Sequence, residues 1–350
     1  MQDAAPGHVS FASDRLRPVR IWLYCLAAFV LLIVVVGGIT RLTESGLSIT
    51  SWKPVSGTIP PLSEADWLEE FEAYKQIPQY TYVHSWMELE DFKFIFFWEW
   101  FHRLLARALG FVFLIPFVVF LFQKRLSRDL AAPLFGLFLL GGFQGFLGWW
   151  MVSSGLSELT SVSQYRLAAH LSAACFLLIA LIYVARSLTP GRVLGNVMGF
   201  HLVTGWVLMI GIVLQIGAGA FVAGLDAGMG YQTWPLMDGA IIPKGLLVME
   251  PAWRNAFENA LTVQFIHRGI AYLLVAYIGW LIWRRHKDGG FAGVHGWLPR
   301  IGIVVLLQVA LGIATLLTSV PISLAVGHQA LAFMLAGLTI AYIADMRRVR

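Results

Sequence analysis

Charged side chains are scarce in this sequence. Only 13% of the 350 residues are charged, whereas 58% are hydrophobic. Such an apolar composition excludes an ordinary water-soluble domain and indicates a polytopic membrane protein surrounded by lipid. Lysine and arginine outnumber aspartate and glutamate by 25 to 20, but the basic residues are dispersed among short loops. The net charge therefore indicates no nucleic-acid partner, which would require a basic patch.

Cysteine is nearly absent as well. The two cysteines, Cys25 and Cys175, both fall inside long apolar runs. They exclude a disulfide framework and a thiolate metal centre, and we expect them to be small core residues. The N-terminal segment also lacks the Arg- and Ser-rich, acid-free composition of a transit peptide, and the first apolar run is too long for a cleaved signal.

Long apolar runs are abundant, and a membrane-spanning helix needs about 20 such residues. We predict eight spans, at residues 21–40, 94–122, 133–153, 165–185, 200–223, 260–283, 299–318 and 324–344. If these spans alternate in direction, every basic cluster falls on one side of the membrane. The positive-inside rule makes that side cytoplasmic, with both termini inside. The predicted fold class is therefore an all-α integral membrane protein.

The first external loop, residues 41–92, contains a predicted short amphipathic helix over 63–76. Ser63 is a candidate N-cap, and Asp66 three residues later can complete a capping box. We expect Trp67, Leu68 and Phe71 to form the apolar face of this helix. It would lie on the membrane surface or over the mouth of a site, and the alternative is a solvated loop.

The second half of the chain repeats the first. Five loop residues recur exactly 182 positions later: Glu44 as Asp226, Gly46 as Gly228, Trp52 as Trp234, Gly57 as Gly239 and Pro61 as Pro243. Further along, Gln144, Leu147 and Gly148 recur as Gln308, Leu311 and Gly312, 164 positions later. Both copies begin on the same side of the membrane, so the repeats are parallel and related by an axis along the membrane normal. We predict eight transmembrane helices in two tandem four-helix bundles with pseudo-two-fold symmetry.

The predicted division of the chain follows from this duplication. It comprises a tail 1–20, a first bundle 21–185 with the external loop 41–92, a linker 186–199, a second bundle 200–344 and a tail 345–350. The glycines of span 133–153 would allow close helix contact; they include Gly141, Gly142, Gly145 and Gly148.

Four histidines lie inside the spans, namely His102, His170, His267 and His328. A histidine in hydrocarbon is costly and indicates a functional site. All four are expected roughly 8–12 Å below the outer boundary, at about 1.5 Å per helical residue. Two histidines at equal depth in one bundle can ligate a haem iron from two sides, so each half would hold one haem. A zinc ion, which prefers three or four ligands, a proton relay and a hydrogen-bonded core histidine are the alternatives.

The remaining histidines and the arginines have simpler interpretations. We expect His8, His286 and His295 to be solvated, His84 to lie in the external loop and His201 to be interfacial. Arg103 and Arg268 directly follow two of the predicted ligands. An arginine fork suits the carboxylates of a haem, although snorkelling to the interface is an equally good explanation.

The two halves differ at four positions. Arg41, Glu99, Arg107 and Arg166 correspond to Ala223, Gln264, Tyr272 and Leu324. Burial favours the protonated form of a carboxyl group, so Glu99 is a candidate proton donor or acceptor, three residues before His102. We therefore predict chemistry in the first half, at Glu99, His102 and His170, and structure or electron transfer in the second. The alternative for Glu99 is an ordinary ion pair with Arg103.

With these motifs the sequence resembles the haem A synthase family of the mitochondrial and alphaproteobacterial type. The resemblance rests on Gly37–Ser48, Trp52–Pro54, Gly57–Pro61 and Glu99 with Phe101–Arg103, and it covers essentially all eight spans. It implies oxidation of the C8 methyl of haem O to a formyl group by successive hydroxylations. It also implies a haem b held by His267 and His328, and haem O or haem A held by His102 and His170, with Glu99 as the essential acid.

The resemblance further implies a bacterial inner membrane, haem O synthase and cytochrome oxidase assembly factors as partners, and leaves homo-oligomers open. Arg41, Arg103, Arg107, Arg166 and Arg268 would contact the haem groups. Some bacterial members have a cysteine pair in the first external loop, which this chain lacks, so the route of the electrons stays open. The competing predictions are a dihaem b-type electron-transfer cytochrome and a haem transporter without redox chemistry.

Overall fold

A computed structural model describes residues 15–53, 55–157, 159–189, 199–287 and 296–347, with backbone only for 199–201 and 347. In these segments the chain is all-helical, apart from one isolated bridge between Met237 and Ala240. Eight helices are long and apolar enough to cross a membrane. They are α1 (Arg17–Leu42), α4 (Leu89–Phe122), α5 (Arg128–Ser153), α6 (Gln164–Ser187), α7 (Gly199–Gly224), α10 (Ala260–Lys287), α11 (Trp297–Leu317) and α12 (Ile322–Arg347). The eight predicted spans and the all-α class are confirmed.

Helix α4 begins five residues earlier than predicted because a capping box fixes its first turn. The side chain of Glu88 accepts from the backbone N–H of Asp91, and Asp91 accepts from the N–H of Glu88 at 3.1 Å. Such reciprocal bonds satisfy amide groups that would otherwise have no partner at a helix start. The apolar run alone did not show this hydrophilic extension beyond the membrane.

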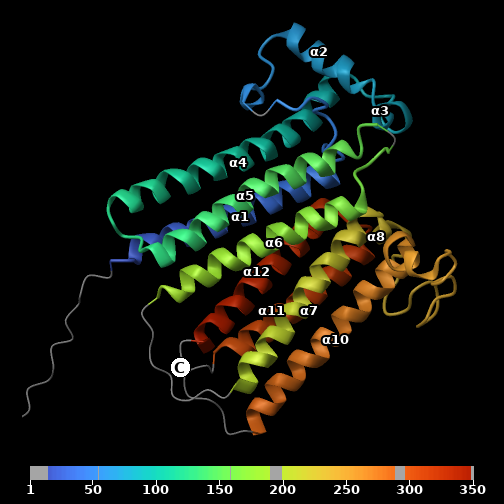
Figure 1. Cartoon of the computed structure of the whole chain (residues 1–350). Helices are drawn as coiled ribbons and strands as arrows, with labels where there is room; N and C mark the ends of the chain where they lie inside the picture. The colour runs from blue at the N-terminus through green and yellow to red at the C-terminus, as the bar shows by residue number, and fades with distance from the viewer. Residues whose placement is uncertain (1–14, 54, 158, 190–198, 288–295, 348–350) are drawn as a thin grey trace, which may run out of the picture.

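The helices lie side by side along their length (Figure 1), and the same pairings occur in both halves. In the first half α1 and α5 each pack against both α4 and α6; in the second half α7 and α11 each pack against both α10 and α12. The halves meet through α6 with α7, α1 with α12, and α6 with α12. This arrangement is compatible with the predicted pair of bundles related by a two-fold axis.

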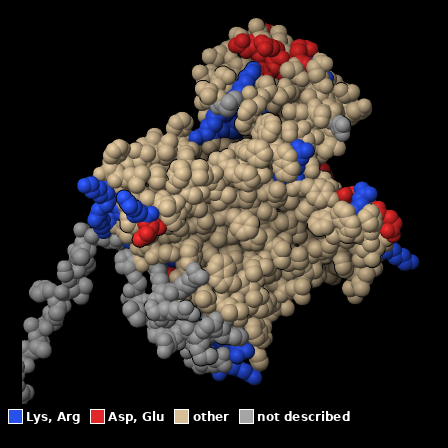
Figure 2. All heavy atoms as spheres, viewed as in Figure 1, with Lys and Arg blue, Asp and Glu red and all other residues tan. Residues whose placement is uncertain are grey.

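Charged side chains gather at the two ends of the helices, and Figure 2 shows an almost uncharged belt between them. One end is predominantly basic, and there Arg125 donates to the carbonyl of Arg15 at 3.0 Å. At the same end Arg186 forms a two-pronged ion pair with Asp345 at 2.5 and 2.6 Å, joining α6 to α12. The apolar belt has the distribution that hydrocarbon requires, with charges confined to its margins.

Two packing predictions are wrong. Cys175 is buried in the core, but Cys25 is exposed on the outer side of α1. Of the four glycines of α5 that were predicted to allow close helix contact, only Gly148 approaches another element closely; a Cβ on Gly141, Gly142 or Gly145 would meet no atom within 4 Å. Composition showed small residues in the helix, but not which of them face a neighbouring helix.

The external loop contains the predicted amphipathic helix, α2 (Glu64–Tyr74), with the predicted capping box between Ser63 and Asp66. It lies beyond the outer end of α4 and is followed by α3 (Pro78–Tyr82) (Figure 1). Phe71 is buried, and Trp67 packs edge-on against Phe96 of α4 with ring centroids 5.0 Å apart. Leu68, the third residue of the predicted apolar face, is 44% exposed and does not pack against α4 as Trp67 does.

A buried histidine organises the same loop. His84 lies between Tyr74, whose hydroxyl is 2.7 Å from Nδ1, and Glu44, whose Oε2 is 2.9 Å from Nε2. Gln79 closes the network by accepting from the Tyr74 hydroxyl and donating to the carbonyl of Glu44. The prediction placed His84 in the external loop, and the structure shows that it holds the two ends of that loop together. His286 is exposed as expected, whereas His8, His295 and the side chain of His201 lie outside the described residues.

This network predicts an acid sensitivity of the loop. The hydrogen bond with His84, assisted by the charges of His84 and Arg41, lowers the pKa of Glu44 below its ordinary value of 4.5. A carboxylate with a depressed pKa stabilises the fold above pH 4.5 and loses that contribution as the pH falls below it. Because Glu44 is half exposed, we expect a loss on the order of 0.5 kcal/mol. Thermal unfolding followed across this pH range should show the loss in the native chain and not in Glu44→Gln.

Candidate functional site

Each of the four membrane histidines packs its ring against a glycine of a neighbouring helix. A Cβ added to that glycine would lie within 3.3 Å of the Cε1 atom of the histidine. The pairs are His102 with Gly37 (2.9 Å), His170 with Gly148 (3.3 Å), His267 with Gly219 (3.2 Å) and His328 with Gly312 (2.7 Å). The glycines recur at the same intervals as the loop motif and the Gln144 motif, 182 and 164 residues. The duplication has therefore kept the space beside the ring at all four positions.

The second histidine pair has a measurable geometry. The ring centroids of His267 and His328 are 6.4 Å apart, with their planes inclined at 72°. Two imidazoles bound to one metal from opposite sides would place their centroids about 6.2 Å apart, given metal–nitrogen bonds of about 2.0 Å and ring centres about 1.1 Å beyond the nitrogen. The observed separation leaves room for one iron between the rings.

Each histidine also has a buried ring nitrogen without a partner, the Nδ1 atom of His102, His170, His267 and His328. A buried polar atom without a hydrogen bond is unfavourable and calls for an explanation such as a bound group. Among the described residues no cluster of three or more His, Cys, Asp or Glu could hold a metal ion. The donor set is therefore two nitrogens per site, which suits an iron whose other ligands come from a porphyrin.

The glycine contacts predict graded effects on the haem expected at these sites. Gly312→Ala and Gly37→Ala would place a methyl group 2.7 and 2.9 Å from a ring carbon, closer than non-bonded atoms approach, so the ring must move. We expect at least a fivefold loss of low-spin, bis-histidine haem at the affected site, measured by absorption spectroscopy. Gly148→Ala, at 3.3 Å, should retain most of it. Equal spectra for all three variants would contradict the close packing.

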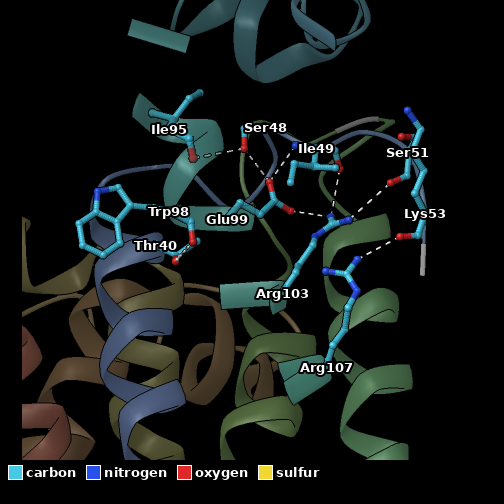
Figure 3. Close-up of polar contacts among 10 residues, drawn as sticks. All are labelled: Thr40, Ser48, Ile49, Ser51, Lys53, Ile95, Trp98, Glu99, Arg103 and Arg107. Carbon is cyan, nitrogen blue, oxygen red and sulfur yellow. Dashed lines mark hydrogen bonds and ion pairs between the residues drawn. The ribbon is translucent and has the colours of Figure 1, made fainter. Parts of the chain in front are cut away.

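Glu99 lies at the outer end of the first site, 3% exposed, in the network drawn in Figure 3. Its Oε2 accepts from the hydroxyl of Ser48 and from the backbone N–H of Ile49, both at 2.8 Å. Its Oε1 accepts from Arg103 at 2.6 Å. Three donors, one of them charged, satisfy this buried carboxyl group and offset the cost of its burial. The ion pair with Arg103, weighed as the alternative, is present, and the loop adds two donors.

The second half builds the same scaffold around an amide. Arg103 donates to the carbonyl of Ile49 at 3.0 Å, and Arg268 donates to the carbonyl of Tyr231, its counterpart 182 residues later, at 3.1 Å. Gln264 stands where Glu99 does, accepts from Arg268 at 3.0 Å and donates to two loop carbonyls, of Ala227 and Tyr231. Only the first half therefore carries an ionisable group at this position.

Arg41 lies where the two halves meet. It donates to the carbonyl of Ala223 at 2.9 Å and forms an ion pair with Asp226 at 2.8 Å. Ala223 is the counterpart of Arg41 itself, and a residue that contacts its own counterpart lies close to the axis that would relate the halves. The Nε atom of Arg41, like that of Arg268, is buried and has no hydrogen-bond partner.

The other two predicted arginines bind nearby loop and helix groups. Arg107 donates to the carbonyl of Lys53 at 3.0 Å, next to the contacts of Arg103 with the same loop (Figure 3). Arg166 donates to the carbonyl of Trp150 and to Ser153, and its guanidinium lies 4.8 Å from the Trp150 ring centroid. All five arginines thus bind groups of the external loops or of the outer helix ends.

The sequence prediction missed three elements of the site: Ser48, Ile49 and the glycine beside each histidine. The glycines could have been found, because they recur at the two intervals that revealed the duplication. Ser48 and Ile49 are about fifty residues before Glu99 and carry no signal of their own. Their contact with the acid depends on how the loop folds back over α4.

These features define a polytopic helical membrane protein with two histidines in the membrane-spanning helices of each half and, at the position of Glu99, an acid in the first half only. The chain belongs to the cytochrome oxidase assembly protein family, whose model matches residues 20–340. It is 52% identical to the heme A synthase of Azorhizobium caulinodans, over 94% of this chain and 93% of that protein. It is 50% identical to the heme A synthase of Chelativorans sp., over 93% and 90%, and 48% identical to that of Brucella ovis, over 96% and 94%.

Proposed function

We propose that this protein is a haem A synthase, which oxidises the C8 methyl group of haem O to a formyl group by successive hydroxylations. The observation that carries the proposal is a chemical difference between two similarly built sites, where Glu99 in the first half corresponds to Gln264 in the second. A pair of equivalent electron-transfer haems would not need it. The relatives, named heme A synthase and about half identical over nearly the whole chain, support the same function.

The residues present fit a resident haem b in the second half. His267 and His328 would hold it, given their separation and their unpartnered ring nitrogens. When bound, this group supplies one-electron redox chemistry. His102 and His170 would hold the substrate haem O in the first half, where Gly37 and Gly148 leave space beside the rings.

Within this function Glu99 would accept the protons released from the substrate methyl group. Its bonds to Ser48, Ile49 and Arg103 fix its direction, and a general base must be held within hydrogen-bond reach of the proton that it takes up. Arg41 and Arg268 are the preferred partners for the porphyrin carboxylates, because each retains a buried unpartnered Nε donor. Arg103, Arg107 and Arg166 would instead anchor loops and helix ends through the carbonyls they bind.

The proposal extends to location and partners. The eight spans and the basic end of the bundle support a bacterial inner membrane with both termini in the cytoplasm. Haem O synthase would supply the substrate, and assembly factors of cytochrome oxidase would receive haem A. Glu99 would then lie on the external side of the membrane.

Extraction of the pigment tests the function directly. The protein is purified from cells that make haem O, and its haem is extracted with acid and acetone and identified by chromatography and mass spectrometry. Haem B together with haem O or haem A is the expected result. Haem B alone, at two per chain, would instead identify a dihaem b-type electron carrier and overturn the assignment of Glu99.

A further inference from the structure

A half-open cavity lies between the external loop and α4, and none of the four membrane histidines lines it. It has a volume of about 350 Å³ and is lined by Ile49, Lys53 and the segment 56–62 of the loop, by α2 and by one face of α4. On α4 it is lined by Phe96, Trp100, Arg103 and Arg107, which share a face at helical spacing. Trp100 is fixed in the wall because its indole N–H donates to the carbonyl of Thr58 at 3.2 Å.

The cavity walls divide into an apolar and a polar part. Aromatic rings and prolines form the apolar part, whereas the polar part holds three cations, Lys53, Arg103 and Arg107, and three carboxylates, Asp66, Glu69 and Glu70. Lys53 and Glu70 already neutralise each other at 2.7 Å. A balanced set of charges does not favour a phosphate or another anion. It does offer hydrogen-bond donors and acceptors to a neutral ring that carries oxygen atoms at its edge.

The size and position of the cavity restrict the ligand further. A volume of about 350 Å³ accommodates one substituted six-membered ring and is too small for a porphyrin. Ile59 and Leu62 line the cavity and are 65% and 80% exposed, so an apolar chain attached to the ring can leave past them toward the lipid. From these features we infer that the cavity binds the head group of a membrane quinone.

The site is specific to the first half of the chain. Lys53 and Arg107 correspond to Pro235 and Tyr272 in the second half, so the polar wall is not duplicated. Arg103 belongs to both the cavity and the Glu99 network, because it lines the cavity and donates to the Glu99 carboxylate at 2.6 Å. One hydrogen bond therefore connects the quinone site to the acid.

The inference rests on the proposed function, because the proposed reaction is what would require a quinone at this place. Hydroxylation of a methyl group with water as the source of the oxygen atom releases two electrons and two protons. A quinone in the cavity would take up both and leave as the quinol, so a quinone site beside Glu99 would connect the reaction to the membrane pool of redox carriers without a cysteine pair in the loop.

Photolabelling tests the inference in the intact protein. Purified protein in lipid nanodiscs is exposed to an azido-substituted ubiquinone with a short chain, and the labelled peptides are identified by mass spectrometry. The expected label falls on the loop around residues 55–62 and on α4 near Trp100, and decylubiquinone competes for it. Excess phosphatidylglycerol should not compete. If this lipid did displace the label, the cavity would bind a phospholipid head group and the quinone inference would be overturned.

A matched pair of variants makes the test specific. Ser56 lines the cavity, so Ser56→Trp should fill it and reduce labelling at least tenfold. Val55, its neighbour, is 82% exposed and does not line the cavity, so Val55→Trp should label like the native chain. Retained haem B shows that each variant is folded. Equal labelling of the two variants, or labelling elsewhere, would overturn the inference.

The same preparation separates the two proposals. Haem A formation without quinone labelling would reject the quinone site and leave the proposed function standing. Specific labelling of a protein that neither binds haem O nor makes haem A would reject the proposed function and indicate a quinone-binding membrane cytochrome.

Discussion

Replacing His267 by alanine should empty the second site of its haem while the chain remains folded. The ring centroids of His267 and His328 are 6.4 Å apart, and among the described residues no third His, Cys, Asp or Glu completes a metal-binding group with them. Loss of either histidine would remove one of the two bonds through which the protein would hold the iron of the proposed haem b. We expect resident haem B to fall at least tenfold in His267→Ala and in His328→Ala, and haem A formation to fall with it.

The corresponding change in the first half should have a different signature. His102→Ala and His170→Ala should keep resident haem B near one per chain, yet lose bound haem O and haem A. Extracted haems, quantified by chromatography against protein concentration, distinguish the two outcomes. His286→Ala, at an exposed position of α10, is the control and should change neither. If His102→Ala lost haem B while His267→Ala retained it, the assignment of substrate and cofactor to the halves would be reversed.

A feature of this structure was predictable where it leaves its own pattern in the sequence, and it was missed where it depends on neighbouring helices. The eight spans were predictable because twenty apolar residues in a row have few alternatives in water or lipid. The histidine pairs were predictable because the duplication repeats them, so that chance buried histidines became improbable. Cys25 and the glycines of α5 were misplaced because the rotation of a helix uniformly apolar on all sides is set by its neighbours.

Contacts across long sequence separations escaped prediction for another reason. Arg41 pairs with Asp226, in the other half, and Glu99 binds loop atoms of Ser48 and Ile49. Neither contact follows from periodicity, because each depends on how two distant segments are brought together by the packing of the helices. Comparison of the halves recovers part of this information, since Ile49 and Tyr231 bind equivalent arginines. The internal repeat thus allows a contact in one half to be compared with the equivalent contact in the other, much as two related structures would be compared.

The second half of the chain also provides the design for the most informative substitution. Glu99→Gln introduces the amide that the second half carries at Gln264, where it binds Arg268 and two loop carbonyls. In the first half the amide oxygen can still accept from Arg103, but the NH2 group would face two donors, the Ser48 hydroxyl and the Ile49 N–H. We therefore expect a folded variant that binds haem, destabilised by the loss of the ion pair and of these two hydrogen bonds. If Glu99 accepts the protons of the reaction, an amide cannot replace it. We expect haem A formation to fall at least a hundredfold, with unmodified haem O accumulating on the protein.

Three comparisons make this result decisive. Glu99→Asp keeps the carboxylate but shortens its reach, so it should retain more haem A formation than Glu99→Gln. If Glu99 had only a structural role that an amide of the same length can fill, Glu99→Gln would instead be the more active variant. Gln264→Glu places an acid in the second site and should leave haem A formation unchanged, because the substrate is not bound there. Resident haem B, measured in every variant, reports folding independently of activity. Normal haem A production by Glu99→Gln would show that Glu99 only holds the external loop in place. The chemical difference between the halves would then have to lie in Arg41, Arg107 and Arg166.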